Sequence, residues 1–168
     1  PAGYPGAAGA GLLVEPDGAS APVDAETSGV EALLMGPGAR RIRAASTPQD
    51  RARLWQGRKK AFGAMGRIAP DLVVQDAVVP RSSLPDVLEQ ILEIGRRYGL
   101  SIANVFHAGD GNLHPNICYD ARDPGLTERV HQAAREIMAA CVAAGGSRTG
   151  EHGGGADTPG YMPRGCAP

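Results

Sequence analysis

Hydrophobic residues recur along this chain with helical spacing in four segments, and the clearest of them covers residues 83–98. Its apolar side chains fall on one face of a helix; they are Leu84, Val87, Leu88, Ile91, Leu92 and Tyr98. Ser83 is a residue type that caps helices, Pro85 fits a first turn, and Gly99 is suited to end the helix. The pattern therefore predicts an amphipathic helix with one buried face.

Three other segments have helical patterns. Residues 22–35 place apolar side chains on one face before a Gly-Pro-Gly stop, and residues 48–65 predict a polar helix. Residues 126–144 predict a helix that buries Val130, Ala134, Ile137, Met138 and Cys141. His131 shares the polar side of this last helix with Arg135, so we interpret His131 as a solvated residue.

Five shorter segments have the composition of strands, namely 11–15, 40–45, 73–79, 100–107 and 113–119. Together with the helices they give the order β-α-β-α-β-α-β-β-α. Strands that follow each other directly, with helices long enough to cover one face, are typical of an α+β fold with a mainly antiparallel sheet. At 168 residues the chain fits a single domain.

The last two strands flank Asp110-Gly111, which is a strong signal for a two-residue hairpin turn. A type I′ turn requires a positive φ at both central positions, and Asp and Gly tolerate that conformation. With these two residues as the turn, His107 pairs directly with His114. The two imidazoles then lie on one face of the hairpin, with Cβ atoms about 4.5 to 5.5 Å apart.

Two imidazoles so placed can bind one cation, because metal–nitrogen bonds are about 2.0 to 2.1 Å long. Glu151, which lies beside His152 among glycines, offers an oxygen ligand. Two neutral imidazoles and a carboxylate leave coordination positions open for a substrate, as in catalytic rather than structural metal sites. The alternative is that His107 and His114 are hydrogen-bonded residues of the core or its rim. Asp110 is interpreted only as a turn former.

Composition narrows the choice of function. The chain has 17 basic and 18 acidic residues and neither a basic stripe nor a long apolar run, so nucleic-acid binding and a membrane span are not indicated. Cys118, Cys141 and Cys166 are odd in number and far apart in the sequence, which argues against a disulfide scaffold and favours a reducing compartment, so we expect the cytoplasm. The start, Pro-Ala-Gly without methionine or signal peptide, is expected of a piece from inside a longer protein.

Four motifs follow one another in an order found in one enzyme family. They are residues 58–70 (RKKAFGAMGRIAP), 75–81 (QDAVVPR), 104–115 (NVFHAGDGNLHP) and 150–153 (GEHG). Together they resemble the C-terminal, substrate-binding domain of FAD-linked 2-hydroxyacid dehydrogenases and oxidases. The resemblance is to the FAD-binding subunit of the glycolate oxidase type, with D-lactate and D-2-hydroxyglutarate dehydrogenases as near relatives.

The resemblance implies a ferredoxin-like α+β cap of the vanillyl-alcohol oxidase type, partial, over residues 1–155, and a degenerate, disordered tail over 156–168. It implies FAD and a divalent metal, zinc or manganese, as cofactors. The implied partners are a small 2-hydroxy acid, a flavin-binding domain missing from this chain, and other glycolate oxidase-type subunits that include an iron–sulfur electron acceptor. The chain is therefore interpreted as a fragment of an enzyme.

The same resemblance assigns roles to single positions: metal ligands at His107, His114 and Glu151, a catalytic base beside the flavin at His152, a carboxylate-binding arginine at Arg58, and a substrate contact at Asn116. In the implied mechanism the metal polarises the C2 hydroxyl, His152 takes its proton, and the C2 hydride passes to flavin N5. Arg58 can grip a carboxylate through two parallel hydrogen bonds. Its alternative is a solvated helix residue packed along its stem.

Two other functions remain compatible with these residues. A non-catalytic metal-binding α+β module would take up a cation without coupling it to a flavin. An inactive gene remnant would fold poorly and have no activity. The family pattern is not kept at Arg148 and Thr158, so the activity of this chain by itself is not expected.

Overall fold

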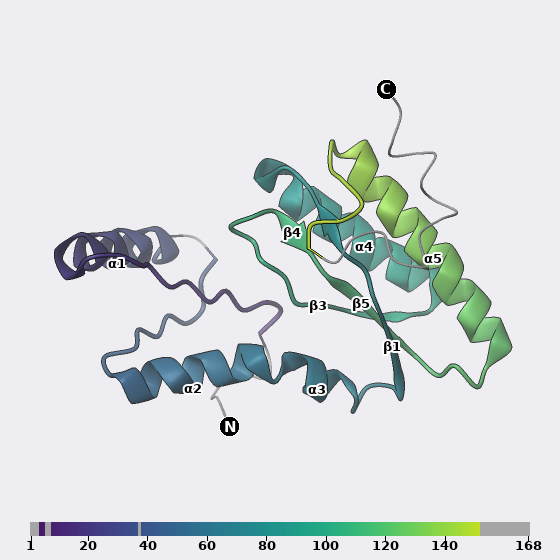
Figure 1. The fold of residues 1–168 in the computed structure, drawn as a ribbon, viewed down its shortest axis with the longest axis horizontal. Helices are drawn as coiled ribbons and strands as arrows, with labels where there is room; N and C mark the ends of the chain where they lie inside the picture. The colour runs from purple at the N-terminus through teal and green to yellow at the C-terminus, as the bar shows by residue number, and fades with distance from the viewer. Residues whose placement is uncertain (1–3, 6–7, 37, 152–168) are drawn as a thin grey trace. The chain divides into compact units, whose positions relative to one another are not determined.

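The computed structural model describes residues 4–5, 8–36 and 38–151, so the tail predicted for residues 156–168 lies outside the described residues. The chain divides into two compact units, Pro1–Lys60 and Ala61–Pro168 (Figure 1). The boundary falls inside the predicted helix 48–65, which is two helices, α2 (Pro48–Lys59) and α3 (Ala61–Met65). Lys60 interrupts them because its backbone, at φ −97° and ψ 3°, leaves the helical conformation.

The first unit contains α1 (Ser20–Leu34) and α2. The start of α2 follows the sequence signals: Pro48 is its first residue, and the Thr47 hydroxyl oxygen accepts a 3.1 Å hydrogen bond from the Asp50 backbone N–H. The predicted helix at 22–35 is confirmed, although its apolar face is not buried, since Leu33 is 82% exposed.

The two strands predicted in the first unit are wrong, because residues 11–15 and 40–45 have no regular secondary structure. A strand is stable only when its backbone groups bond to a neighbouring strand. The described part of this unit contains no strand that could serve as a partner. Leu12 and Val14 are accordingly exposed, at 65% and 44%.

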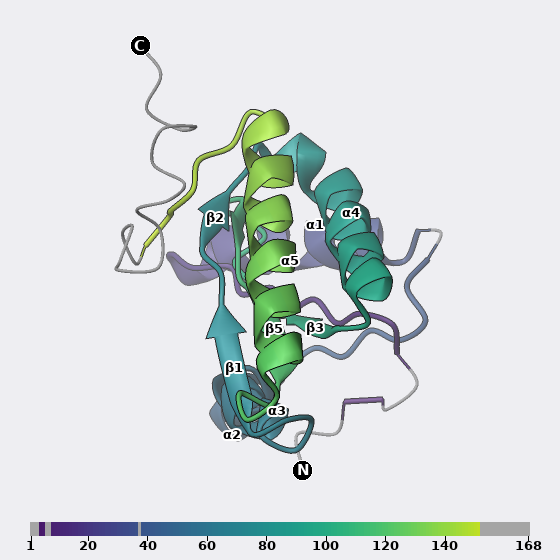
Figure 2. The same ribbon diagram turned by 90° about the vertical axis from the view of Figure 1, so that its right-hand side faces the viewer.

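The second unit is built on an antiparallel sheet of three strands in the order β1 (Asp71–Val74), β5 (Pro115–Tyr119) and β3 (Ser101–Asn104). Two helices, α4 (Leu84–Tyr98) and α5 (Pro124–Ala143), pack side by side on one face of it (Figure 2). The predicted α+β class with an antiparallel sheet is confirmed, as is the helix predicted at 126–144.

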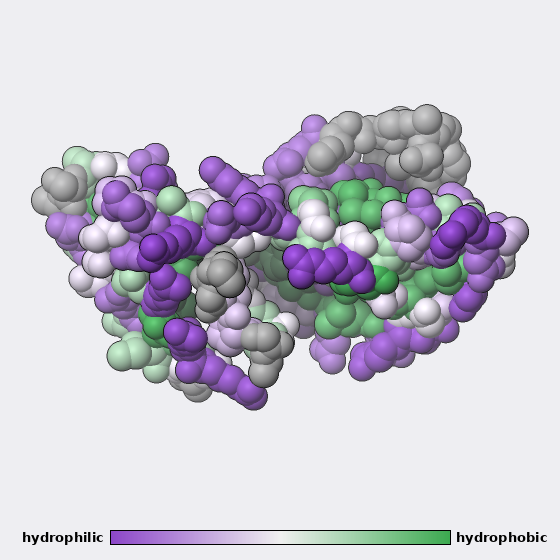
Figure 3. Space-filling model, turned by 90° about the horizontal axis from the view of Figure 1, so that it is seen from below, coloured by the Kyte–Doolittle hydropathy of each residue, from purple (hydrophilic) through white to green (hydrophobic). Residues whose placement is uncertain are grey.

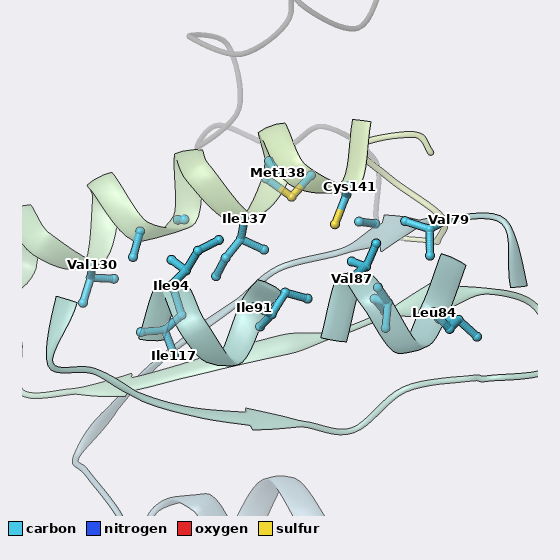
Figure 4. Close-up of a cluster of buried hydrophobic side chains, with 14 residues drawn as sticks. Val79, Leu84, Val87, Ile91, Ile94, Ile117, Val130, Ile137, Met138 and Cys141 are labelled. Carbon is cyan, nitrogen blue, oxygen red and sulfur yellow. The ribbon is translucent and has the colours of Figure 1, made fainter. Parts of the chain in front are cut away.

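The core lies between these two helices and the sheet (Figure 4). Ile91 of α4, Ile117 of β5 and Ile137 of α5 are fully buried there. Cys141, predicted to be a core residue, is buried, as is Cys118, and both are free thiols in the described part of the chain. His131, predicted to be solvated, is exposed.

Helix α4 follows its predicted boundaries closely. A short 3-10 turn, η1 (Arg81–Ser83), precedes it, and Gly99 ends it in the left-handed conformation with φ 64°. The predicted burial of Leu92 is wrong, since this residue is 49% exposed. The buried face is completed by Ile94 and Gly95 instead, because the missing side chain of Gly95 lets Ile102 of β3 pack closely.

The predicted strand 73–79 is split between two sheets. Its first half is β1, and its second half is β2 (Ala77–Val78), which pairs with β4 (Asn112–Leu113) in a separate two-stranded sheet. Both ladders share one register, and extending it across the gap places Asp76 opposite His114. Between the two ladders, the Gln75 N–H donates a 2.9 Å hydrogen bond to the Pro115 carbonyl, so the chain stays paired across the gap.

In the part of the chain that the structure describes, no helix has the length and apolar character needed to cross a membrane.

Several large apolar side chains of the second unit reach the surface, among them Phe62, Ile68 and Val74, which are 40%, 55% and 42% exposed. Figure 3 shows apolar side chains between hydrophilic ones on the part of the molecule at the right of Figure 1.

Candidate metal centre

The hairpin that carries the two histidines has a wider turn than the sequence predicts. His107 pairs with Asn112, with N–H groups donating at 3.0 and 3.2 Å to the opposite carbonyls, and residues 108–111 form the turn. Gly111 has a φ of 72°, but none of the described non-glycine residues has a positive φ, so Asp110 is not in a type I′ turn. The predicted two-residue turn and the direct pairing of His107 with His114 are therefore wrong.

A third segment of the chain packs against the turn. Asn112 and Leu113 pair with β2, and the Val79 N–H donates 2.9 Å to the Gly111 carbonyl. This third segment brings its backbone so close that a side chain at Gly111 would lie 2.1 Å from the Val79 carbonyl oxygen. The pair His107–Asn112 continues the register in which β3 pairs with β5, so the ladder between these two strands fixes the wider turn.

The two histidines still lie on one face of the hairpin, because the register differs from the predicted one by two residues and side chains alternate with a period of two. Their ring centroids are 5.7 Å apart, with ring planes at 87°. Glu151 joins them: its Oε1 lies 3.9 Å from His107 Nε2, and its Oε2 lies 3.7 Å from His114 Nε2. The predicted set of three ligands is brought together.

The geometry of this triad fits a small cation. One ligand atom from each of the three residues lies within 4.8 Å of the other two. Two ligands bound at about 2.1 Å in tetrahedral geometry are about 3.4 Å apart, so side-chain movements of at most about 1.4 Å would bring these atoms from within 4.8 Å to bonding positions around a metal.

The three residues differ in burial. The side chain of His114 is 5% exposed, while those of His107 and Glu151 are 46% and 50% exposed. One side of the triad is therefore anchored in the protein and the other faces outward. A site of this kind can leave coordination positions for a substrate oxygen, which a closed structural metal site does not.

Sequence reasoning missed a fourth residue, Asp76. Its Oδ2 accepts hydrogen bonds from the Thr149 hydroxyl at 2.8 Å and from the N–H groups of Gly150 and Glu151 at 2.9 Å each. Its Oδ1 lies 3.8 Å from His114 Nδ1. In the sequence, the segment 75–81 shows an acidic residue directly before a strand, which could have indicated Asp76. Only the pairing register shows that Asp76 faces His114.

The loop that carries Glu151 is held against β2. Ser147 and Val78 exchange backbone hydrogen bonds of 2.8 and 3.1 Å. A Cβ atom at Gly150 would lie 2.6 Å from Val78 Cγ2 and 2.8 Å from Asn112 Nδ2. The space that a side chain at Gly150 would need is therefore occupied by β2 and by the residue that pairs with His107.

Asn116, predicted to contact substrate, is fully buried in β5. Its amide nitrogen donates to the carbonyl oxygens of His114 at 2.6 Å and Ala103 at 2.9 Å. These bonds join the backbone of a predicted ligand to β3, so Asn116 supports the geometry of the triad. Its contact with substrate stays a prediction.

The contacts described above do not include the two remaining predicted residues, Arg58 and His152. Arg58 is a half-buried residue near the end of α2, in the first unit, whereas the triad belongs to the second. His152 follows Glu151 directly in sequence and lies outside the described residues. The roles of Arg58 as carboxylate anchor and of His152 as base stay predictions.

Comparison with known proteins decides the family. Residues 1–168 match the model of the C-terminal domain of FAD linked oxidases. The chain belongs to this family. Its resemblance to FAD-linked oxidases, first suggested by four motifs, is thereby confirmed.

Individual relatives point the same way. The chain is 47% identical over 152 residues to the glycolate oxidase subunit GlcD of Escherichia coli (strain K12), which covers 90% of the chain. It is 38% identical over 153 residues, 91% of its length, to the same subunit of Bacillus subtilis (strain 168). It is 29% identical over 125 residues, 74% of its length, to a D-lactate dehydrogenase of Archaeoglobus fulgidus.

These relatives are much longer proteins. The matched part is 30% of the E. coli subunit, 33% of the B. subtilis subunit and 27% of the Archaeoglobus enzyme. The chain thus spans about a third of the length of the curated relatives that it matches.

Proposed function

We propose that this chain is the substrate- and metal-binding part of a flavin-dependent oxidoreductase that oxidises a small 2-hydroxy acid to the 2-oxo acid. The convergence of His107, His114 and Glu151 is the observation that supports the proposal most directly. The substrate class comes from the relatives, whose names specify glycolate and D-lactate, both small 2-hydroxy acids.

The donor set suits a divalent transition metal, zinc or manganese, because these ions accept two imidazoles and a carboxylate. When bound, the metal would make the substrate C2 hydroxyl more acidic, and the flavin of the complete enzyme would accept the C2 hydride. The outward-facing side chains of His107 and Glu151 leave room for the hydroxyl oxygen on their exposed side. His114 anchors the set from its buried position.

We assign proton removal to His152, which directly follows a proposed ligand, and substrate orientation to Arg58 and Asn116. An imidazole is suited to accept the hydroxyl proton near neutral pH. A guanidinium can hold the substrate carboxylate through two parallel hydrogen bonds, which a lysine cannot reproduce. The proposed complete enzyme includes a flavin-binding domain and an iron–sulfur subunit of the glycolate oxidase type, and it works in the cytoplasm.

Metal analysis of the purified chain tests the site. After dialysis against zinc or manganese and removal of free ion, we expect about one equivalent in the wild type and almost none in a His107→Ala, His114→Ala double variant. His131→Ala is the matched control, because this histidine is exposed on α5 and is not one of the proposed ligands. Full metal content in the double variant would contradict the proposal.

A further inference from the structure

We propose that Asp76 is a positioning residue of this metal centre, which holds Glu151 through the backbone and orients the ring of His114. The inference rests on the metal-binding role proposed above. Asp76 lies between β1 and β2, opposite His114, and its side chain is 8% exposed. A carboxylate this deeply buried is stable only with several polar partners, so its surroundings show what it organises.

One oxygen of Asp76 organises the loop of Glu151. Oδ2 accepts from three groups of consecutive residues, the Thr149 hydroxyl and the N–H groups of Gly150 and Glu151, at 2.8, 2.9 and 2.9 Å. Hydrogen bonds to a charged acceptor are stronger than neutral ones. The backbone of Glu151 is therefore fixed to a segment about 75 positions earlier in the chain, and its carboxylate is directed to the histidines.

The other oxygen faces His114. Oδ1 lies 3.8 Å from Nδ1, on the opposite side of the ring from Nε2, which lies 3.7 Å from Glu151 Oε2. Metal-binding histidines commonly direct their second ring nitrogen to a carboxylate, which keeps the hydrogen on that nitrogen and leaves the first one available as a ligand. At 3.8 Å the two atoms are beyond hydrogen-bond distance, so Asp76 acts on the ring through its nearby charge, which favours a hydrogen on Nδ1 and leaves Nε2 to bind metal.

Asp76 is not itself one of the proposed ligands. The group of side chains able to hold a cation consists, among the described residues, of His107, His114 and Glu151. Asp76 instead lies next to two of these ligands: it accepts a hydrogen bond from the Glu151 backbone N–H, and it faces the Nδ1 atom of His114. Its loss should weaken metal binding without removing a ligand, by the 10- to 100-fold that such partners commonly contribute.

Three variants separate the two tasks of this carboxylate. Asp76→Asn keeps an oxygen acceptor for the loop but removes the charge that faces His114, whereas Asp76→Ala removes both. Thr149→Val removes one of the three donors and keeps the charge. Asp110→Asn is the matched control, because it removes an exposed carboxylate from the same hairpin.

The measurements are zinc affinity by competition with a chelator, hydrogen exchange of the Gly150 and Glu151 amides, and ¹⁵N shifts of the His114 ring. We expect Asp76→Asn to lower the affinity for zinc by about 10- to 100-fold. In this variant His114 should no longer prefer to carry its hydrogen on Nδ1, while the amides of Gly150 and Glu151 stay protected. Asp76→Ala should lose affinity and amide protection together. Asp110→Asn should match the wild type.

Wild-type affinity in both Asp76 variants would overturn the inference, and so would unchanged amide exchange in Asp76→Ala. A wild-type chain that binds no zinc or manganese would instead refute the proposed metal site. The exchange measurement needs no metal, so it would still decide whether Asp76 orders the loop.

Discussion

At the scale of single residues, two proposed ligands of the same type have unlike surroundings. His114 is 5% exposed and faces carboxylates on both sides, whereas His107 is 46% exposed at the mouth of the turn. A buried polar side chain contributes to folding as well as to binding, because its removal leaves its neighbours without a partner. The two histidines should therefore differ when each is replaced alone.

We expect His114→Ala to lower the free energy of unfolding of the metal-free chain by about 1 to 3 kcal/mol, and His107→Ala to change it by less than about 0.5 kcal/mol. Urea unfolding in the presence of a chelator measures both. Equal destabilisation by the two substitutions would show that the difference in burial has no energetic consequence.

The proposed base gives a second prediction at this scale. In a complete enzyme that carries this domain, His152→Ala should slow flavin reduction by about 10²- to 10⁴-fold with unchanged metal content, because it removes a proton acceptor and no ligand. His107→Ala should lose metal as well as rate. Rapid-mixing absorbance of the flavin, together with metal analysis, separates the two effects. Wild-type reduction rates in His152→Ala would reject the assignment.

At the scale of elements, α5 is held by a continuous buried face that includes Cys141. Burial raises the pKa of the Cys141 thiol from an ordinary 9.0 to about 11, since the thiolate would lose its hydration. The folded chain thus keeps this proton to a higher pH than the unfolded chain does. The thiol's contribution to stability is complete below about pH 9 and is lost as pH rises to about 11.

The free energy of unfolding should therefore fall more steeply between pH 9 and pH 11 in the wild type than in Cys141→Ala. The stability difference between them should narrow by roughly 2 to 3 kcal/mol across this window. Chemical denaturation at a series of pH values measures it. Parallel curves for the two proteins would indicate that the thiol does not ionise at higher pH in the folded state.

At the scale of the whole molecule, the matched portion is about a third of each glycolate oxidase subunit. We place the flavin-binding part of the proposed enzyme outside this portion. The chain purified by itself should accordingly retain no FAD after gel filtration, as read from absorbance near 450 nm, while still taking up metal. A stoichiometric yellow chromophore would contradict this division of roles.

Much of the second unit could be predicted from local pattern. The apolar stripe and the terminal Gly99 predict α4 nearly to the residue, and the five apolar positions predicted for the last helix are all buried. The composition of the triad was also predictable, because two histidines on neighbouring strands and a carboxylate beside a glycine loop form a recognisable ligand set. These features depend on periodicity and residue type, which are properties of the sequence itself.

Tertiary structure decided the rest, because it depends on which backbone groups find partners. The segments 11–15 and 40–45 have strand composition but no strand to pair with in their unit, and the run 73–79 is divided between two sheets. The register in which β3 pairs with β5 sets His107 opposite Asn112 and so gives a wider histidine turn. The sequence by itself thus determined which chemical groups the site contains. Hydrogen bonding between distant segments determined their register, and with it the placement of Asp76 behind His114 and Glu151.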